Sequence, residues 1–422
     1  MEKMKKTYSF LFAAVALFAA ASCQDELISN ETPAVQGERF TVTAAADAQT
    51  KTALTDEGLN SVWTPGDAIA VIDFIGNGTK FTTDITENAA SAKFTCENFN
   101  TGGLTDISAL PIVALYPYQA GLTCSIYSAE ANPTGDNTIK GITFPHEQTA
   151  VAGSFDKTAA FTWANATGAT KDALEFNNLY SLLKVKVTEE NITSITVSAT
   201  SGSLAGNVTL PITQSGAELT VIDGQGQSSV TLTCEDGFDT EKYYYICVLP
   251  GAYEGFSIAL DGYTVKTRKS PFAFEAATVY NLGEVEREVC DWGLVGQHQG
   301  WDITNPTKLY KVAENVYAIF NIKLESNGFK FAKLGLKDWN TGNSYFGAWR
   351  DSGSGYFNFS TEMSVGAWYS GIYTDNTGGQ DANIGVSDFS KKYDVYWKIV
   401  EDYGNSQQMG YTVAPAGTKI TY

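Results

Sequence analysis

Residues 182–199 read LLKVKVTEENITSITVSA, and this stretch decides the class of the fold. In LLKVKV (182–187) and SITVSA (194–199), apolar and polar residues alternate one by one, with Val and Ile at the apolar positions. A period of two places the apolar side chains on one face of an extended chain, so both runs are predicted to be half-buried β-strands. The mostly polar segment between them predicts a loop.

The same alternation recurs along the chain, in FTVTA (40–44), AIAVIDF (68–74) and FSIAL (256–260). Sustained helical periodicity is nearly absent, and the 39 glycines are enough to supply many turns between strands. The pattern therefore predicts an all-β protein built as packed sandwiches.

Residues 62–67, VWTPGD, predict a turn that leads into a buried strand. Pro65 presets φ for a turn, Gly66 can adopt a positive φ, and the Asp67 side chain can hydrogen-bond to the turn backbone. Trp63, directly before the turn, is predicted to fill the core.

The N-terminus has the pattern of an export signal. Lys3, Lys5 and Lys6 precede the apolar run 10–21, FLFAAVALFAAA. This run is shorter than the roughly 20 apolar residues that a membrane-spanning helix needs. Residues 20–23, AASC, resemble the lipobox of bacterial lipoproteins, which implies a signal peptide over residues 1–22 and lipid on Cys23. The alternative is ordinary secretion, with Cys23 left as a free thiol.

The residues after Cys23 predict where the chain is displayed. Residues 24–26, QDE, resemble the surface-export signal of Bacteroidetes lipoproteins, although they also suit a solvated linker. Residues 23–37 are predicted to be a lipid-anchored tether. The expected location is the outer membrane, with the protein facing the cell surface.

Charge and cysteine usage exclude some partners and leave one pairing open. A formal net charge of −19 and a pI near 4.5 oppose contact with nucleic acid, which is bound by neutralising its phosphates. Besides Cys23, an odd number of cysteines remains, without metal-site spacing. A Cys234–Cys247 disulfide is possible but not predicted, and Cys247 is expected to be a small buried residue. The odd cysteines stand at positions 96, 124, 234, 247 and 290.

Several short pieces in order resemble the fimbrillin-like (Mfa-like) family of Bacteroidetes surface lipoproteins. The resemblance covers residues 38–286 and implies two transthyretin-like β-sandwich subdomains, joined near residue 165, with a role in fimbriae or adhesion. The pieces that carry it are VWTPGD (62–67), ALYPY (114–118), FNNLYSLL (176–183), LAG (204–206), VLPG (248–251) and VYNLG (279–283).

The same resemblance implies a candidate processing site at Arg39, the only arginine before Arg268. In some members of the family, a protease cuts after an arginine near the N-terminus and frees a groove for a strand of the next subunit. The alternative is that Arg39 is simply an exposed edge-strand residue.

Tryptophan becomes frequent after Arg287, which predicts a domain boundary there and a C-terminal domain over residues 287–422. This domain resembles the repeat of SusE/SusF-type starch-binding lipoproteins, which implies an immunoglobulin-like β-sandwich that binds carbohydrate. The matching pieces are WGLVG (292–296), GW (300–301), YAIFNIKL (317–324), GFKF (328–331), DW (338–339), FG (346–347) and GGQDANI (378–384).

A carbohydrate site needs flat aromatic rings for the apolar faces of pyranoses and polar groups for the hydroxyls. The candidate rings are Trp301, Trp349 and Trp368, and the candidate hydroxyl donors are Lys330 and Lys333. Trp292 and Trp339 lie inside the resembling motif and are expected in the core, and each candidate ring could be packed there too.

Catalytic motifs are missing from the sequence. His146 and His298 are the only histidines and stand far apart, and His298, in a Gly/Gln-rich turn, is expected at the surface. No phosphate-binding loop, zinc motif or nucleophile motif occurs, so we expect neither an enzyme nor a cofactor. The leading hypothesis is glycan capture, in adhesion or nutrient gathering, and the alternative is an accessory or tip fimbrial subunit assembled by donor-strand addition.

Overall fold

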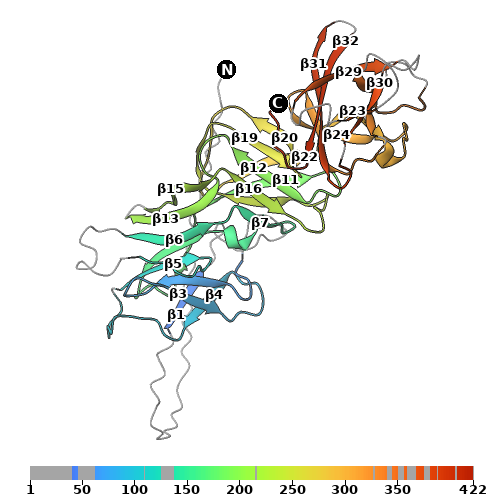
Figure 1. The fold of residues 1–422 in the computed structure, drawn as a ribbon. Coiled ribbons are helices and arrows are strands. Elements are labelled where there is room, and N and C mark those ends of the chain that lie inside the picture. The colour runs from blue at the N-terminus through green and yellow to red at the C-terminus, as the bar shows by residue number, and fades with distance from the viewer. Residues whose placement is uncertain are drawn as a thin grey trace, which may run out of the picture. The chain divides into compact units, whose positions relative to one another are not determined.

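The computed structural model describes residues 40–45, 62–108, 110–124, 137–213, 216–326, 328–339, 345–349, 356–358, 367–374, 381–386, 388–403 and 406–421. In these ranges the regular structure consists of β-strands and two single-turn 3₁₀ helices, η1 (Lys157–Ala159) and η2 (Gln297–Gln299) (Figure 1). The predicted all-β class is therefore confirmed. None of the described helices is long and apolar enough to cross a membrane.

The first strands form an eight-stranded sheet in the order β10-β8-β5-β2-β3-β4-β1-β9. Its neighbours are antiparallel except for β1 and β9, which run parallel. The strands are β1 (Phe40–Ala45), β2 (Ala68–Ile72), β3 (Gly78–Thr83), β4 (Ser91–Cys96), β5 (Pro111–Tyr116), β8 (Thr162–Thr167), β9 (Leu174–Glu175) and β10 (Asn177–Asn178).

The predicted turn at 62–67 stands where β2 begins. Gly66 has a φ of +82°, and the Thr64 N–H donates to the Asp67 carboxylate at 2.7 Å. Trp63 is 1% exposed and meets Phe94, Tyr116 and Phe176 edge-on. The predicted roles of Trp63, Gly66 and Asp67 are confirmed.

The next strands form smaller sheets with five, four, three and two members. The five-stranded sheet has the order β20-β19-β12-β16-β7, and the three-stranded sheet has the order β17-β11-β22. The strands are β6 (Thr138–Phe144), β7 (Glu147–Thr149), β11 (Ser181–Val187), β12 (Ser194–Ala199), β13 (Ala205–Thr213), β14 (Gly216–Ala217), β15 (Thr220–Gln227), β16 (Ser229–Thr233), β17 (Tyr244–Val248), β18 (Gly251–Tyr253), β19 (Phe256–Leu260), β20 (Tyr263–Arg268), β21 (Phe272–Phe274) and β22 (Val279–Val285).

The stretch 182–199 forms β11 and β12, which belong to different sheets. Leu183, Val185 and Val187 are completely buried, whereas Lys184 and Lys186 between them are only half-buried. The predicted alternation is confirmed, because one face of β11 packs into the core.

The strands from β23 onward pair only among themselves in the described residues. Eight of them close a ring, since β23-β24-β25-β31-β32-β29-β27-β26 are neighbours in turn and β26 also pairs with β23. Trp292, Phe331 and Trp397 fill the interior. The strands are β23 (Val289–Gly296), β24 (Thr307–Ala313), β25 (Val316–Ile322), β26 (Phe329–Lys333), β27 (Tyr345–Trp349), β28 (Tyr356–Asn358), β29 (Tyr369–Thr374), β30 (Asp381–Gly385), β31 (Tyr393–Tyr403) and β32 (Ser406–Pro415).

Contacts also link β20 and the β11–β12 loop to the C-terminal strands. The Tyr263 ring stacks on Phe320 at 4.6 Å, and its hydroxyl accepts the Phe320 N–H at 3.0 Å. The Arg287 guanidinium donates to both carboxylate oxygens of Glu189, at 2.7 and 3.0 Å, and lies 3.9 Å from the centre of the Tyr310 ring.

Candidate functional site

The backbone turn after β23 presents Trp301. Chain reversal occurs at η2 and Gly300, where the Gly300 N–H donates to the Gln297 carbonyl at 3.1 Å. Gly300 has a φ of +75°, and Trp301 itself has a φ of +61°. The Trp301 N–H donates to the Gly296 carbonyl at 2.9 Å. Bulky side chains rarely occupy this left-handed region, so the surrounding hydrogen bonds hold Trp301 in a strained conformation.

The Trp301 side chain is half-buried and belongs to a small apolar cluster of its own. It packs on Val295, Ile303 and Ala332, together with Leu336 and Trp339. The centres of the Trp301 and Trp339 rings lie 6.2 Å apart, and their planes are inclined by 52°. Both rings keep part of their surface in solvent. We call Trp301 and Trp339 the tryptophan pair.

Lys330 lies on the same face of β26 as this cluster. It is directly opposite Val295 in the antiparallel register, and Ala332 follows two residues later. Residues opposite each other and residues two apart share one face of a sheet. Lys333 does not join them, because its ammonium lies 5.6 Å from the centre of the Trp292 ring, in a different cluster.

The other candidate rings are not at the tryptophan pair. Trp368 is half-buried, its indole N–H donates to the Thr421 carbonyl at 3.2 Å, and Lys398 lies 5.4 Å above its ring. It packs with the cluster around Tyr263 instead. Trp349 ends β27, and its side chain lies outside the described residues. Among the expected core residues, Trp292 is indeed 2% exposed, whereas Trp339 is only half-buried.

His298 lies in the same turn as Trp301 and contacts β24. One ring nitrogen, Nε2, is 3.0 Å from the Thr307 hydroxyl, and Nδ1 is buried without a protein hydrogen-bond partner. Burial lowers the pKa of His298 to about 4, so the ring is neutral at physiological pH. His298 is half-buried beside Thr307 of β24, so it is only partly the surface residue that was expected.

The cysteines that the structure describes are not joined in disulfides. Cys96, Cys124, Cys234, Cys247 and Cys290 are all free thiols. Burial raises the pKa of Cys247, which is completely buried as expected, and raises that of Cys290 to about 12. Two other predicted sites, the lipidated Cys23 and the cut site Arg39, lie outside the described residues.

A metal centre is not visible in the part of the chain that the structure describes, since it contains no cluster of three or more His, Cys, Asp or Glu side chains suited to an ion. His146 lies 3.8 Å from Glu147 at the surface, far along the chain from His298. The described residues do place two partly exposed tryptophan rings side by side.

Sequence reasoning missed the pairing of Trp301 with Trp339. Both residues were marked by the Gly-Trp and Asp-Trp pieces, but only one was expected to reach solvent. The Gly300-Trp301 turn was the available signal, because a glycine in the left-handed region often precedes a change of chain direction.

No family model matches this chain, and no curated protein matches it. Similar solved structures include a candidate cell adhesion protein from Bacteroides uniformis ATCC 8492, with 18% sequence identity, 58% of this chain and 92% of that chain covered, and a TM-score of 0.36. A fimbrial protein from Bacteroides ovatus ATCC 8483 has 12% identity, 58% and 47% coverage, and a TM-score of 0.27.

A third similar structure is a fimbrial assembly protein from Parabacteroides distasonis ATCC 8503, with 13% identity, 58% and 91% coverage, and a TM-score of 0.27. The sequence identity and the TM-score are low for all three proteins. The function proposed below therefore rests on this chain's own residues.

Proposed function

We propose that this chain is a non-catalytic lipoprotein, held at the outer membrane by Cys23, that binds glycan at the tryptophan pair. The observation that carries the proposal is the left-handed backbone of Trp301. Among the described non-glycine residues with positive φ, Trp301 is the only aromatic one, the rest being Asn, Asp or Ala. Backbone strain of this kind costs about 1–3 kcal/mol and concentrates at functional sites.

The chemistry of the surface suits a sugar. Each indole ring offers an apolar face to the C–H groups of a pyranose, and little side-chain entropy is lost because the rings are already packed. The 52° inclination of the two rings gives two faces that a bent saccharide can touch at once. Lys330, on the same sheet face, supplies a donor for hydroxyl or carboxylate oxygens.

Affinity gel electrophoresis of residues 24–422 against a panel of polysaccharides tests this function. We expect at least one glycan to retard the wild-type chain. Trp301→Ala should weaken binding at least about tenfold, which corresponds to about 1.4 kcal/mol. Trp368→Ala is the matched control, because it removes a half-buried indole from another cluster. Equal losses in both variants, or no retardation by any glycan, would reject the tryptophan pair as the site.

An accessory fimbrial subunit is the second candidate, and the position of β1 bears on it. Val42 and Ala44 of β1 are completely buried, and β1 pairs with both β4 and β9. A cut after Arg39 would leave β1 on the mature chain, so it would not empty a groove by removing this strand. Arg39→Ala separates the two candidates: a block of polymerisation would favour the fimbrial role, and unchanged polymerisation would count against it.

A further inference from the structure

Two neighbouring loops at one end of the first sheet expose apolar side chains. Ile75, in the turn between β2 and β3, is 67% exposed, and Leu104 is 45% exposed. These are the two most exposed large apolar side chains among the described residues. Exposed apolar groups that gather in one place commonly mark an interaction site.

Hydrogen bonds and packing hold the two loops together. The Phe74 N–H donates to the Asn100 carbonyl at 2.9 Å, and Gly102 lies against the Phe74 ring so closely that a β-carbon there would be 2.5 Å from it. The Asp73 carboxylate accepts the N–H groups of Ile75 and Asn77, at 3.1 and 2.8 Å. These contacts fix the conformation of both loops. We call the two loops, residues 74–79 and 98–105, the apolar tip.

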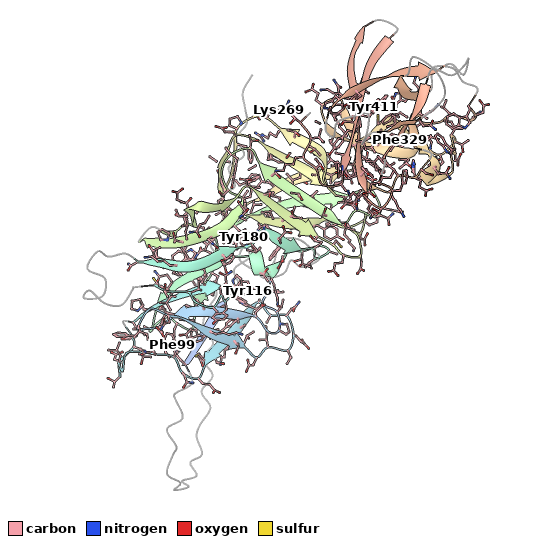
Figure 2. The ribbon with its side chains drawn as sticks, in the orientation of Figure 1. Phe99, Tyr116, Tyr180, Lys269, Phe329 and Tyr411 are labelled. Carbon is pink, nitrogen blue, oxygen red and sulfur yellow. The ribbon has the colours of Figure 1, made fainter. Side chains whose placement is uncertain are left out.

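The apolar tip adjoins Phe40, the first residue of β1. The ring of Phe40, the first residue of β1, lies 4.6 Å from the ring of Phe99, centre to centre. Phe99 precedes Asn100, whose carbonyl binds the Ile75 turn, and Figure 2 labels it at this end of the first sheet. Only residues 24–39 separate Phe40 from Cys23, which limits the distance to the predicted lipid to about 60 Å even for a fully extended chain.

The loop segments themselves are uncharged, and charged residues border them. Residues 74–79, FIGNGT, and residues 98–105, NFNTGGLT, contain no Asp, Glu, Lys or Arg. Of the bordering residues, Asp73 is buried beneath the Ile75 turn, whereas Lys80, Glu97 and Asp106 are exposed. Charged groups resist transfer into the region between lipid headgroups and acyl chains, whereas exposed Ile, Leu and Phe favour it in proportion to the apolar area buried.

We propose that the apolar tip docks on the bilayer surface to which the chain is anchored, with Ile75 and Leu104 entering the lipid interface. The inference rests on the lipid anchor of the proposed function but not on glycan binding. Docking would turn a chain that is held at one point into one that is held at two, and would orient the first sheet with its Phe99 end toward the membrane.

The test places a fluorophore on one introduced thiol at a time, in the variants Ile75→Cys, Leu104→Cys and Val151→Cys. The partly exposed native thiols are first removed as Cys96→Ser and Cys234→Ser. Residues 24–422 with an N-terminal hexahistidine tag are then held on phosphatidylcholine vesicles that contain nickel-chelating and brominated lipids, so the result does not depend on natural lipidation. Val151 is the matched control, because it is 44% exposed on an equally uncharged turn, which bonds to Tyr243 instead.

We expect brominated lipid to quench the probe at Ile75 and Leu104 several-fold more than the probe at Val151. Leu104→Ser should reduce the quenching of the probe at Ile75. Quenching that is equal at all positions, or absent from all, would overturn the proposal. The proposal would also be overturned if, without vesicles, the Ile75 probe became shielded from water as the protein concentration rises. A second copy of the chain would then be the partner. Absence of natural Cys23 lipidation, seen by mass spectrometry, would also overturn the proposal, because docking rests on that anchor. Absence of glycan binding would contradict only the glycan site.

Discussion

Trp63 and Trp301 both lie beside tight turns, but their side chains are buried to different extents. Trp63 is 1% exposed and touches Phe94, Tyr116 and Phe176 edge-on. Trp301 is half-buried, has one aromatic neighbour and lies on a left-handed backbone. The difference shows that neighbours from other strands, and not the turn itself, decide whether a tryptophan is enclosed in the core or keeps part of its surface in solvent.

The largest effect should come from removing the buried ring. Trp63→Ala leaves a cavity between β-strands of the first sheet and should lower the free energy of unfolding by about 3–5 kcal/mol. Trp301→Ala should cost much less, because part of its surface is already in water. Urea denaturation followed by circular dichroism measures both, and similar losses in the two variants would break the comparison.

The next effect concerns Arg287, which links the β11–β12 loop to the C-terminal strands through Glu189 and Tyr310. Arg287→Ala leaves the Glu189 carboxylate, which is only 25% exposed, without its partner and removes the stack on Tyr310. We expect a loss of about 1–3 kcal/mol in unfolding free energy, since the pair is partly solvated. Lys311→Ala, which breaks the more exposed pair with Glu288, is the control and should cost less than about 1 kcal/mol. A larger loss from Lys311→Ala would contradict this ranking.

The third effect is a pH dependence in the turn that carries Trp301. The pKa of His298 is lowered from 6.5 to about 4 in the folded chain, so the unfolded chain binds the extra proton first as the pH falls. Stability should therefore decrease between about pH 6.5 and pH 4, and be unaffected by this group above that window. Thermal melts measure this effect. Between pH 6.5 and pH 4, the Tm of the wild type should fall by about 2–4 °C more than the Tm of His298→Gln. Parallel curves would show that His298 does not titrate as argued.

The smallest effect tests the backbone strain directly. Trp301→Gly and Trp301→Ala both remove the indole, but only glycine adopts the positive φ without cost. The glycine variant should be more stable than the alanine variant by about 1 kcal/mol. At Trp63, whose φ is not positive, glycine should be the less stable of the two. Alanine matching glycine at position 301 would mean that the turn relaxes once the ring is gone.

Much of the fold could be predicted because its signals are local. Alternation over 182–199 predicted β11 and β12, and the VWTPGD turn predicted the roles of Trp63, Gly66 and Asp67. The glycan site was harder, since three rings were proposed and the described structure separates Trp368 from Trp301. Spacing along a strand does not say which strands become neighbours.

By itself, the sequence determined the strand class, the buried faces and the acidic charge, because each follows from residue type and a period of two. Only the tertiary structure decided that Trp301 meets Trp339, that Lys330 shares their face, and that Phe99, beside the Ile75 turn, packs on Phe40. These contacts join segments that are far apart in the chain, so they depend on strand order and register, which no local pattern encodes.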